Sequence, residues 1–234
     1  MKAIIMAGGL GTRLRPLTNE IPKPMVPIID RPILQYIVEL LREYDFTEIA
    51  VALNYRPEII IDYFKDGAAF GVRLEYFVES EALGTAGCVK NAGDFLGDDF
   101  LVMSGDSFTD IDLNEFKEFH FRKNALFSLA CKQADDTSGF GVLRAAKDGK
   151  ILEFIEKPEG GRPGLVNTGI YMINRRVLEL VPDGFYDFGK DLLPRLVGNG
   201  LFAYKTSRYW SDIGSLPSYY STNRFVAENM ERYY

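Results

Sequence analysis

The stretch KAIIMAGGLGTRLRPL, residues 2–17, decides how this chain begins to fold. Its first part, KAIIMA, is a short continuous apolar run, which is typical of a fully buried strand in a parallel sheet. The turn GGLG follows at once, and glycine costs backbone entropy unless the main chain needs positive φ or a ligand approaches it closely. Arg13 and Arg15 come next, and guanidinium groups beside exposed backbone N–H groups suit a phosphate. The stretch therefore predicts a buried strand that ends in a phosphate-binding loop.

Length and composition limit what kind of protein this chain can be. Its 234 residues, 47% of them hydrophobic, suffice for one large domain with a sizeable core. The formal net charge of −6 argues against a nucleic-acid partner, and no apolar run reaches the ~18 residues that a membrane span needs. Only Cys88 and Cys131 are present, and a strand that starts at Lys2 leaves no room for a signal peptide. We therefore expect a cytoplasmic protein without a disulfide framework, a membrane partner or a nucleic-acid partner.

Helix-like and strand-like runs alternate along the chain. In the first half, apolar spacing predicts helices over 30–44, 56–64 and 84–95 and strands over 48–54, 72–78 and 99–104. The second half is dominated by strand-like runs over 124–132, 140–146, 150–156, 165–174 and 201–206, with helices over 177–181, 188–197 and after Ser215. We predict an α/β fold in a single domain over 1–234: a Rossmann-like open, mostly parallel mixed sheet with helices on both faces and a small antiparallel lobe.

The glycine loop has rival interpretations. A dinucleotide fingerprint needs a third glycine where Leu14 stands, and an acidic residue at the end of the second strand, where Asn54 stands. A P-loop would close with Gly-Lys-Ser/Thr, which is absent from this stretch. A plain structural turn with chance arginines stays open, and the functional alternative is a nucleotide-phosphate loop closed by Arg13.

A longer ordered set of motifs carries a family resemblance. GGLGTRLRPLT is followed by PKPM, GTAG, SGD, EKP, NTGIY and DIG in that order. This set resembles the sugar-1-phosphate nucleotidyltransferases, and within them it is most similar to the mannose-1-phosphate guanylyltransferases. The resemblance implies a nucleotide-binding half over about 1–112 and a sugar-phosphate-binding half, which includes the antiparallel lobe, over about 113–234. It also implies that the C-terminal β-helix domain of many members is missing.

The same resemblance implies roles for individual residues. The catalytic residues are Arg13, Lys23, Asp106 and Lys157, and a single Mg²⁺ is held by Asp106 and Asp212. The nucleotide is bound by Gly8, Gly9, Leu10, Gly11, Thr12, Arg13, Lys23, Glu79, Gly84 and Thr85. The sugar phosphate is bound by Gly141, Glu156, Lys157, Asn167, Thr168 and Asp191, although Asp191 could equally cap the helix that follows it.

The chemistry that the resemblance implies needs cations more than a base. A sugar-1-phosphate oxygen attacks the α-phosphate of an NTP and releases pyrophosphate. The nucleophile is already an anion, so the obstacle is repulsion between two polyanions. His120, the single histidine, lies in an amphipathic stretch and is expected at the surface rather than in catalysis. Whether the protein is a monomer or a homodimer is left open.

Glu79 bears on the choice of base, because it follows the strand over 72–78. Relatives that use uracil or thymine resemble this stretch but carry glutamine at that position. One carboxylate can accept both N1–H and the 2-amino group of guanine, so GTP is the expected nucleotide. A solvated loop acid at Glu79 or Glu81 is the alternative. There are three competing functions. They are transfer from dTTP, UTP or ATP to glucose-1-phosphate or another sugar-1-phosphate, a non-catalytic nucleotide-sensing regulatory subunit, and a nicotinamide oxidoreductase.

Overall fold

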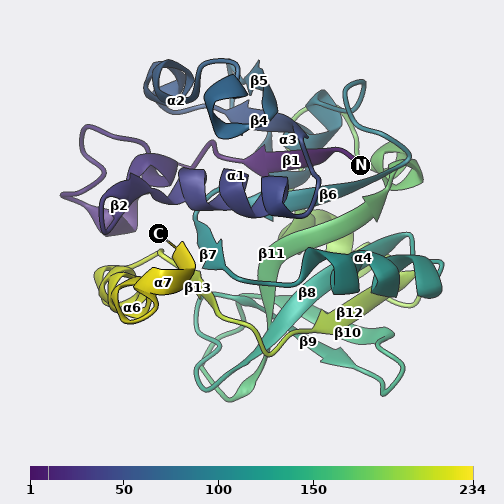
Figure 1. Ribbon diagram of the computed structural model, residues 1–234. Coiled ribbons are helices and arrows are strands. Elements are labelled where there is room, and N and C mark those ends of the chain that lie inside the picture. The colour runs from purple at the N-terminus through teal and green to yellow at the C-terminus, as the bar shows by residue number, and fades with distance from the viewer. Residues whose placement is uncertain (10, 234) are drawn as a thin grey trace.

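A nine-stranded mixed sheet forms the centre of the computed structural model, which describes residues 1–9 and 11–233 (Figure 1). Seven strands follow the order β10-β9-β11-β6-β1-β4-β5, and β8 and β12 extend the sheet from β11. The strands of this sheet are β1 Ala3–Met6, β4 Glu48–Leu53, β5 Arg73–Val78, β6 Asp99–Ser104, β8 Phe127–Ala134, β9 Gly141–Ala145, β10 Ile151–Glu156, β11 Gly164–Asn174 and β12 Leu201–Lys205. Two small ribbons pair β2 Pro27–Ile28 with β3 Arg31–Pro32, and β7 Ser107–Thr109 with β13 Trp210–Asp212.

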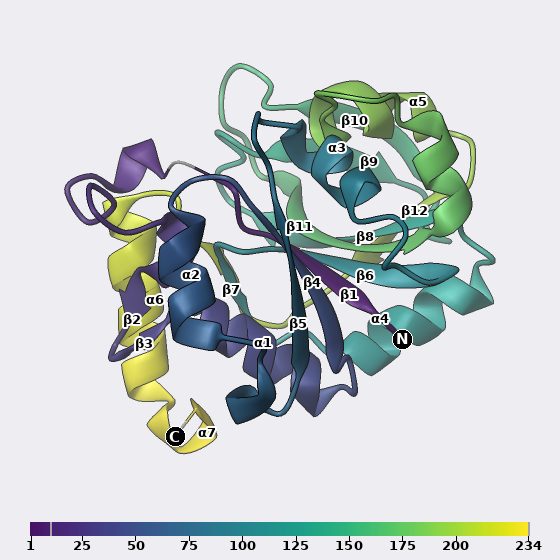
Figure 2. The same cartoon turned by 90° about the horizontal axis from the view of Figure 1, so that it is seen from above.

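Helices lie on both faces of this sheet (Figure 2). The α-helices are α1 Ile33–Glu43, α2 Pro57–Phe64, α3 Gly84–Asn91, α4 Leu113–Arg122, α5 Leu193–Leu196, α6 Leu216–Glu228 and α7 Met230–Tyr233. Short 3₁₀ turns span Thr12–Leu14, Lys23–Met25, Ala68–Phe70 and Arg175–Leu180, and a π-helical turn spans Phe188–Leu192. One apolar core joins α1, α2 and α4 to the sheet, and a second joins α3 and α5 to it. The predicted fold class is therefore confirmed.

Strand β1 lies at the middle of the parallel part, as its apolar sequence predicts. It pairs in parallel with β4 on one side and with β6 on the other, so Met6 faces Ala52 and Ser104 across the ladder. The chain leaves these strands at one common edge of the sheet. Because β1 ends at this carboxyl edge, the glycine loop begins there. Ligands of open α/β sheets bind at the same edge.

The antiparallel strands are continuous with the main sheet. Strand β11 runs antiparallel to β6, β8 and β9. Its pairing with β8 shifts register between Asn167 and Tyr171, and Gly169 within this irregularity has φ +76. The early part of β11 can thus pair with β9 while its later part pairs with β6. The expected small lobe is an extension of one sheet rather than a separate layer.

Helix α4 corrects the prediction for His120, which the structure buries completely. Asp112 caps this helix by accepting a hydrogen bond from the Glu115 N–H. His120 Nδ1 lies 2.9 Å from Ser128 Oγ, and Nε2 lies 3.3 Å from Asp99 Oδ1. Burial lowers the pKa of His120, although Asp99 opposes this shift. The surface placement was wrong because α4 turns this residue inward onto two strands that the amphipathic pattern alone could not locate.

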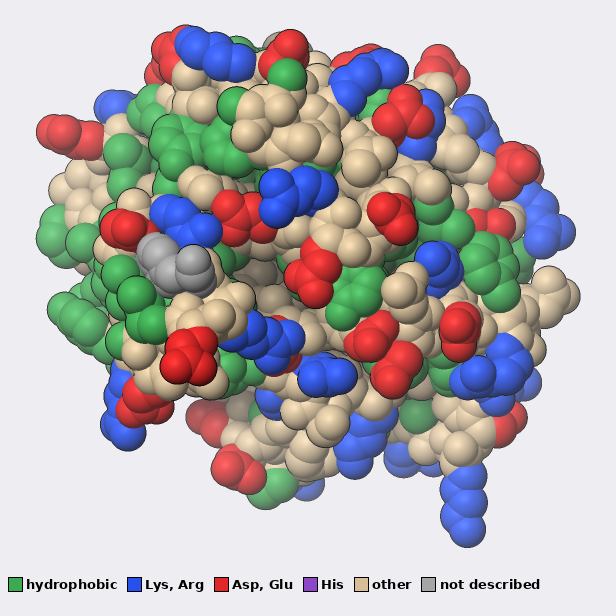
Figure 3. All heavy atoms as spheres, in the orientation of Figure 1, with side chains coloured by type: hydrophobic (Ala, Val, Ile, Leu, Met, Phe, Trp, Pro, Cys, Tyr) green, Lys and Arg blue, Asp and Glu red, His purple; other side chains and the backbone are tan. Residues whose placement is uncertain are grey.

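Several element boundaries also differ from the predictions. The helix expected over 84–95 ends at Asn91, and that over 188–197 begins as a π-helical turn. Acidic and basic side chains are interspersed over the face shown in Figure 3. Among the described residues, the helices are all too short or too polar to cross a membrane.

Two glycines of α3 let the loop before the π-helical turn pack directly on that helix. A Cβ on Gly87 would lie 2.5 Å from the Gly184 carbonyl oxygen, and one on Gly84, where φ is +72, would lie 2.6 Å from the Tyr186 oxygen. The N–H groups of Ala86 and Gly87 both donate to the Tyr186 carbonyl. The first turn of α3 is therefore capped by the loop instead of by a side chain.

Replacing Gly87 by alanine should destabilise the protein by about 1–3 kcal/mol, because the new methyl group meets backbone that cannot rotate away. Urea unfolding measures this loss. Gly97→Ala is the matched control, since its nearest atom to a new Cβ is the Asp99 oxygen at 3.9 Å, and it should change the free energy of unfolding by less than about 0.5 kcal/mol. Equal effects at both positions would contradict the close packing of α3.

Candidate active site

Two aspartates from distant parts of the chain face each other at the carboxyl edge of the sheet. Asp106 follows β6 in sequence, and Asp212 ends β13. The β7–β13 ribbon brings them together, since Asp212 pairs with Ser107 and the Ile213 N–H donates to the Asp106 carbonyl. The ribbon therefore brings together two aspartates that are more than 100 residues apart in sequence. This ribbon was not predicted from the sequence.

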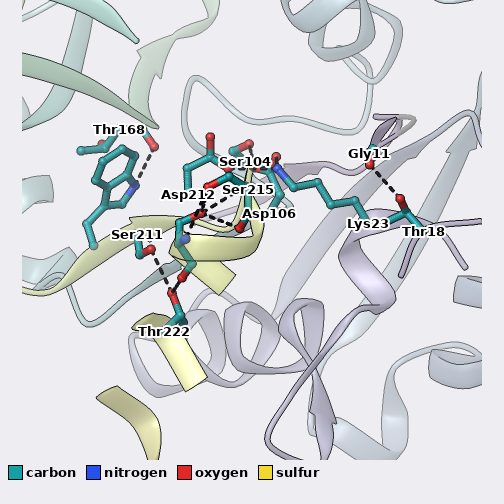
Figure 4. A network of polar contacts seen from close by, with 12 residues as sticks. Gly11, Thr18, Lys23, Ser104, Asp106, Thr168, Ser211, Asp212, Ser215 and Thr222 are labelled. Carbon is teal, nitrogen blue, oxygen red and sulfur yellow. Dashed lines mark hydrogen bonds and ion pairs between the residues drawn. The ribbon is translucent and has the colours of Figure 1, made fainter. Parts of the chain in front are cut away.

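Lys23 lies between the two carboxylates (Figure 4). Its Nζ is 2.5 Å from Asp106 Oδ2 and 2.9 Å from Asp212 Oδ1. The side chain is 8% exposed, so these contacts are shielded from water. Pro22 and Pro24 flank it in a 3₁₀ turn, which holds its backbone stiffly. The PKPM motif thus presents an ammonium group to both carboxylates.

The charges in this cluster shift one another's pKa values. Burial disfavours the charged form of Lys23, but the two carboxylates more than compensate and raise its pKa. Burial likewise opposes ionisation of Asp106, but Lys23 and the hydroxyl of Ser104 lower the pKa of Asp106. Burial and the neighbouring Asp106 raise the pKa of Asp212 against the effect of Lys23. Ser104 Oγ donates to Asp106 Oδ1 at 2.5 Å, so both oxygens of Asp106 have partners.

The donor set fits a divalent cation completed by substrate. Within residues 1–9 and 11–233, no group of three or more His, Cys, Asp or Glu side chains could hold a metal. Asp106 and Asp212 nevertheless direct one oxygen each to a single point, which the ammonium group of Lys23 occupies. Mg²⁺ prefers oxygen ligands and is commonly bound by one or two carboxylates plus substrate phosphates.

Gly11 of the glycine loop packs against the base of the Lys23 side chain. Gly11 has φ +62, and a Cβ there would lie 3.0 Å from Lys23 Cβ. Thr18 Oγ1 donates to the Gly11 carbonyl at 2.7 Å, which holds the turn. Arg13 is exposed, and Gly214 lets it lie beside Asp212, because a Cβ on Gly214 would be 3.1 Å from Arg13 Nη2 and 2.9 Å from Asp212 Oδ2. Of the predicted loop residues, Leu10 lies outside the described residues.

A cavity of about 340 Å³ opens beside this cluster at the carboxyl edge. It collects six residues of the predicted site: Gly8, Gly9, Glu79, Gly84, Thr85 and Asp106. A larger hollow of about 740 Å³ lies around Asp99 and Asn174, at the opposite end of β6 and β11. None of the predicted residues lines that hollow, so its size does not make it the better candidate.

Glu79 lies half-buried in this cavity at the end of β5. Its backbone N–H donates to the Leu53 carbonyl at 2.7 Å, and Asn54 Nδ2 donates to its carbonyl at 3.3 Å. Its carboxylate accepts a hydrogen bond from the Leu83 N–H at 3.0 Å. Burial raises the pKa of Glu79, and the Leu83 contact partly offsets this. Glu79 is thus partly shielded from water, whereas Glu81 is exposed.

Seven of the thirteen lining residues were not predicted from sequence, and the four polar or aromatic ones are Asn54, Ser104, Phe185 and Asp187. Thr85 Oγ1 donates to Asp187 Oδ2 at 3.0 Å and accepts from the Phe188 N–H at 2.8 Å. Phe185 stays 63% exposed at the cavity although its loop is held against α3. Ser104 ends the buried strand β6 and Asn54 directly follows the buried strand β4, which is the signal that could have found them. The sequence has no comparable signal for the loop of Phe185 and Asp187.

Glu156 occupies a space that two glycines leave open. A Cβ on Gly141 would lie 2.8 Å from Glu156 Oε2, and a Cβ on Gly189 would overlap the same carboxylate. Lys157 is exposed with φ +45, and its Nζ lies 3.3 Å from Glu156 Oε1. The EKP motif thus places an acid inward and a lysine outward.

The other predicted sugar-phosphate residues have protein partners of their own. Asn167 Nδ2 donates to the Tyr171 hydroxyl at 2.9 Å, and the buried Thr168 Oγ1 donates to the Ala130 carbonyl at 2.7 Å. Asp191 accepts from the Asp187 N–H at 2.8 Å. Asp191 therefore makes the capping-type contact that was the alternative to its binding role.

A glycine loop, a buried lysine shared by two carboxylates, and an adjoining cavity at the carboxyl edge of a mixed sheet define a nucleotide-handling α/β protein. The nucleotidyl transferase family profile matches residues 2–229. This chain belongs to the nucleotidyl transferase family, as its ordered motifs predicted, and the oxidoreductase alternative is wrong.

Named relatives within this family differ in substrate. UTP–glucose-1-phosphate uridylyltransferase of Synechocystis is 39% identical over 97% of this chain and 63% of that protein. Mannose-1-phosphate guanylyltransferase 1 of Arabidopsis thaliana is 33% identical over 99% of this chain and 66% of that protein. D-glycero-α-D-manno-heptose 1-phosphate guanylyltransferase of Campylobacter jejuni is 38% identical over 76% of this chain and 77% of that protein. The chain spans less than two thirds of the length of the first two.

Solved structures share the fold. The HddC protein of Yersinia pseudotuberculosis superposes with a TM-score of 0.85 at 30% identity, over 96% of this chain and 98% of that one. A second structure of it is a complex with GMP-PN.

Proposed function

We propose that this chain transfers a guanylyl group from GTP to a sugar-1-phosphate, mannose-1-phosphate in the first instance, and releases pyrophosphate. The observation that carries the proposal is the Lys23–Asp106–Asp212 cluster beneath the glycine loop, next to the cavity that contains Glu79. Free, buried cysteines accord with a cytoplasmic setting for this reaction.

The reaction forms one bond and breaks one. An oxygen of the sugar-1-phosphate attacks the α-phosphorus, and the bond from that phosphorus to the bridging oxygen of the β-phosphate breaks. The electron pair leaves with pyrophosphate, and no proton has to be removed because the attacking oxygen is already an anion.

The residues of this chain would hold the two polyanions together. Arg13 and Lys23 would contact the triphosphate, and Lys157, which is exposed beside Glu156, would hold the sugar phosphate in line. Asp106 and Asp212 would hold Mg²⁺, which supplies charge neutralisation for the phosphates. Glu156 would accept hydrogen bonds from sugar hydroxyls.

The position of Glu79 favours guanine as the base. Its carboxylate is half-buried in the cavity and can accept from N1–H and the 2-amino group together. Uracil and thymine offer one N3–H between two carbonyls, and adenine offers an acceptor at N1, so a carboxylate suits both less well. The names of the Campylobacter and Arabidopsis relatives favour guanine too. The name of the Synechocystis relative favours the alternative, a uridylyltransferase acting on glucose-1-phosphate.

A nucleotide-sensing subunit without catalysis is the alternative from another class. Such a protein has no need to retain the charged set, whereas Arg13, Lys23, Asp106, Lys157 and Asp212 are all present. Pyrophosphate release, measured for GTP, UTP, dTTP and ATP against a panel of sugar-1-phosphates, tests both the activity and the pair of substrates.

Turnover should depend strictly on a divalent metal. Asp106→Asn and Asp212→Asn should each lower kcat by about 100-fold or more, the scale of losing one electrostatic contact to a transition state. Asp94→Asn, at a fully exposed carboxylate paired only loosely with Arg175 at 3.6 Å, is the control and should keep activity. Full activity in excess EDTA after metal removal would contradict the proposed chemistry.

Alanine substitutions at Arg13 and Lys157 should change different kinetic constants. Arg13→Ala should lower kcat more than it raises the KM for NTP, because its charge is needed most as the α-phosphate becomes pentacoordinate. Lys157→Ala should mainly raise the KM for the sugar phosphate. Steady-state kinetics with each substrate varied in turn separates the two effects, and the reverse pattern would mean that the two subsites are wrongly assigned.

Glu79→Gln should erode the preference for GTP over UTP by about 1–3 kcal/mol, since a buried donor of guanine loses its acceptor. Competition among GTP, UTP, dTTP and ATP at equal concentration measures this. The pKa of Glu79 is raised, so the carboxylate is ionised above that pKa and is lost as the pH falls through it. The KM for GTP should therefore rise in acid at a pH above the ordinary glutamate range, and Glu79→Gln should remove this dependence. Preferred use of UTP or dTTP by the wild type would overturn the guanylyl assignment.

A further inference from the structure

Lys23 occupies the position to which both aspartates direct an oxygen. Its Nζ contacts Asp106 at 2.5 Å and Asp212 at 2.9 Å, and its side chain is shielded from water. We propose that Lys23 is the resident counter-ion of the carboxylate pair in the ligand-free protein, and that it exchanges this position for the phosphates when metal and nucleotide arrive together. The inference rests on the proposed metal role of Asp106 and Asp212.

The carboxylate pair needs a counter-ion because both members are close and largely buried. Their side chains are 29% and 21% exposed, so water screens their mutual repulsion poorly. Arg13 also lies near Asp212, but Arg13 is exposed to water. Lys23 is the cation that touches both carboxylates among the described residues. In the ligand-free protein it therefore keeps them at a spacing that suits a metal.

The ammonium group and a divalent ion exclude each other at this point. Mg²⁺ takes oxygen ligands at about 2.0–2.1 Å, so an ion bound to both carboxylates would overlap the present Nζ position and be repelled by its charge. Metal alone must displace Lys23 without offering it a new partner. Metal bound to a triphosphate brings anionic oxygens that can receive the ammonium. The free protein should thus bind divalent ions weakly, and the metal should enter with the nucleotide.

The geometry around Lys23 favours a swing of the side chain over a movement of the backbone. The Val26 N–H donates to the Lys23 carbonyl at 3.1 Å, and Met25 N–H donates to the Pro22 carbonyl at 2.8 Å. The lysine side chain is a flexible four-carbon stem. Gly11 packs against its Cβ, and rotation about the outer bonds of the stem moves the ammonium group. A short swing keeps the ammonium under the glycine loop, where phosphates would lie.

Binding of Mn²⁺ to the free protein, followed by electron paramagnetic resonance without nucleotide or sugar, tests this exchange. Lys23→Met should bind Mn²⁺ at least about tenfold more tightly than the wild type, because the competing charge is gone. Lys90→Met is the matched control: it removes a half-buried lysine that pairs with Asp183 at 2.7 Å and lines the hollow around Asp99 instead of the cavity, so it should leave Mn²⁺ affinity unchanged. The double variant Lys23→Met/Asp212→Asn should lose the gain, which locates the bound ion.

Thermal unfolding provides a second measurement. Without Lys23 the two carboxylates repel each other, so Mn²⁺ should raise the Tm of Lys23→Met more than that of the wild type. Lys23→Gln serves in the same way if Lys23→Met does not fold. An Mn²⁺ affinity within about threefold of the wild type, or a gain that survives Asp212→Asn, would overturn the exchange. Because no nucleotide or sugar is present, such a result is distinct from failure of the guanylyltransferase assay.

Discussion

The contact of one buried ammonium with two carboxylates is the interaction on which the site depends. Lys23, Asp106 and Asp212 come from a proline-flanked turn, the end of a central strand and a short ribbon near the C-terminus. Two buried carboxylates near each other are unfavourable without a cation. The cluster is therefore stable only when all three segments are held in place, and much of the surrounding structure can be understood as doing so.

Helix α6 connects the segments that carry Lys23 and Asp212. The Tyr219 hydroxyl donates to the Pro27 carbonyl at 3.0 Å, just after the PKPM turn. On the other side, Thr222 Oγ1 donates to Ser211 Oγ at 2.9 Å, and Phe225 stacks on Tyr209 with ring centroids 3.5 Å apart. The helix thus fixes the position of the ribbon relative to the turn, although none of these residues belongs to the cluster.

The residues proposed for phosphate chemistry and those proposed for recognition of the base and the sugar lie at different places along the carboxyl edge of the sheet. In the function we propose, the phosphate chemistry would depend on charges that the PKPM turn, the end of β6 and the ribbon bring together. In the same proposal, the base would be read elsewhere in the cavity, where Glu79 follows β5, and the sugar would be read near Glu156 in its glycine-lined space. Such a separation would allow members of one family to differ in nucleotide or sugar, as the names of the uridylyl and guanylyl relatives do.

The sequence by itself determined the fold class, the family and the identity of the charged residues. These follow from local patterns. Continuous apolar runs predict buried parallel strands, and ordered motifs such as PKPM and EKP can be recognised without knowledge of tertiary contacts. Only the tertiary structure decided that Lys23 contacts both aspartates, that His120 is buried, and that the loop of Phe185 lines the cavity. These depend on pairings across the chain, such as Asp212 with Ser107 over more than 100 residues, and on glycines whose missing side chains admit a neighbour. A local pattern contains no information about which distant segment fills that space.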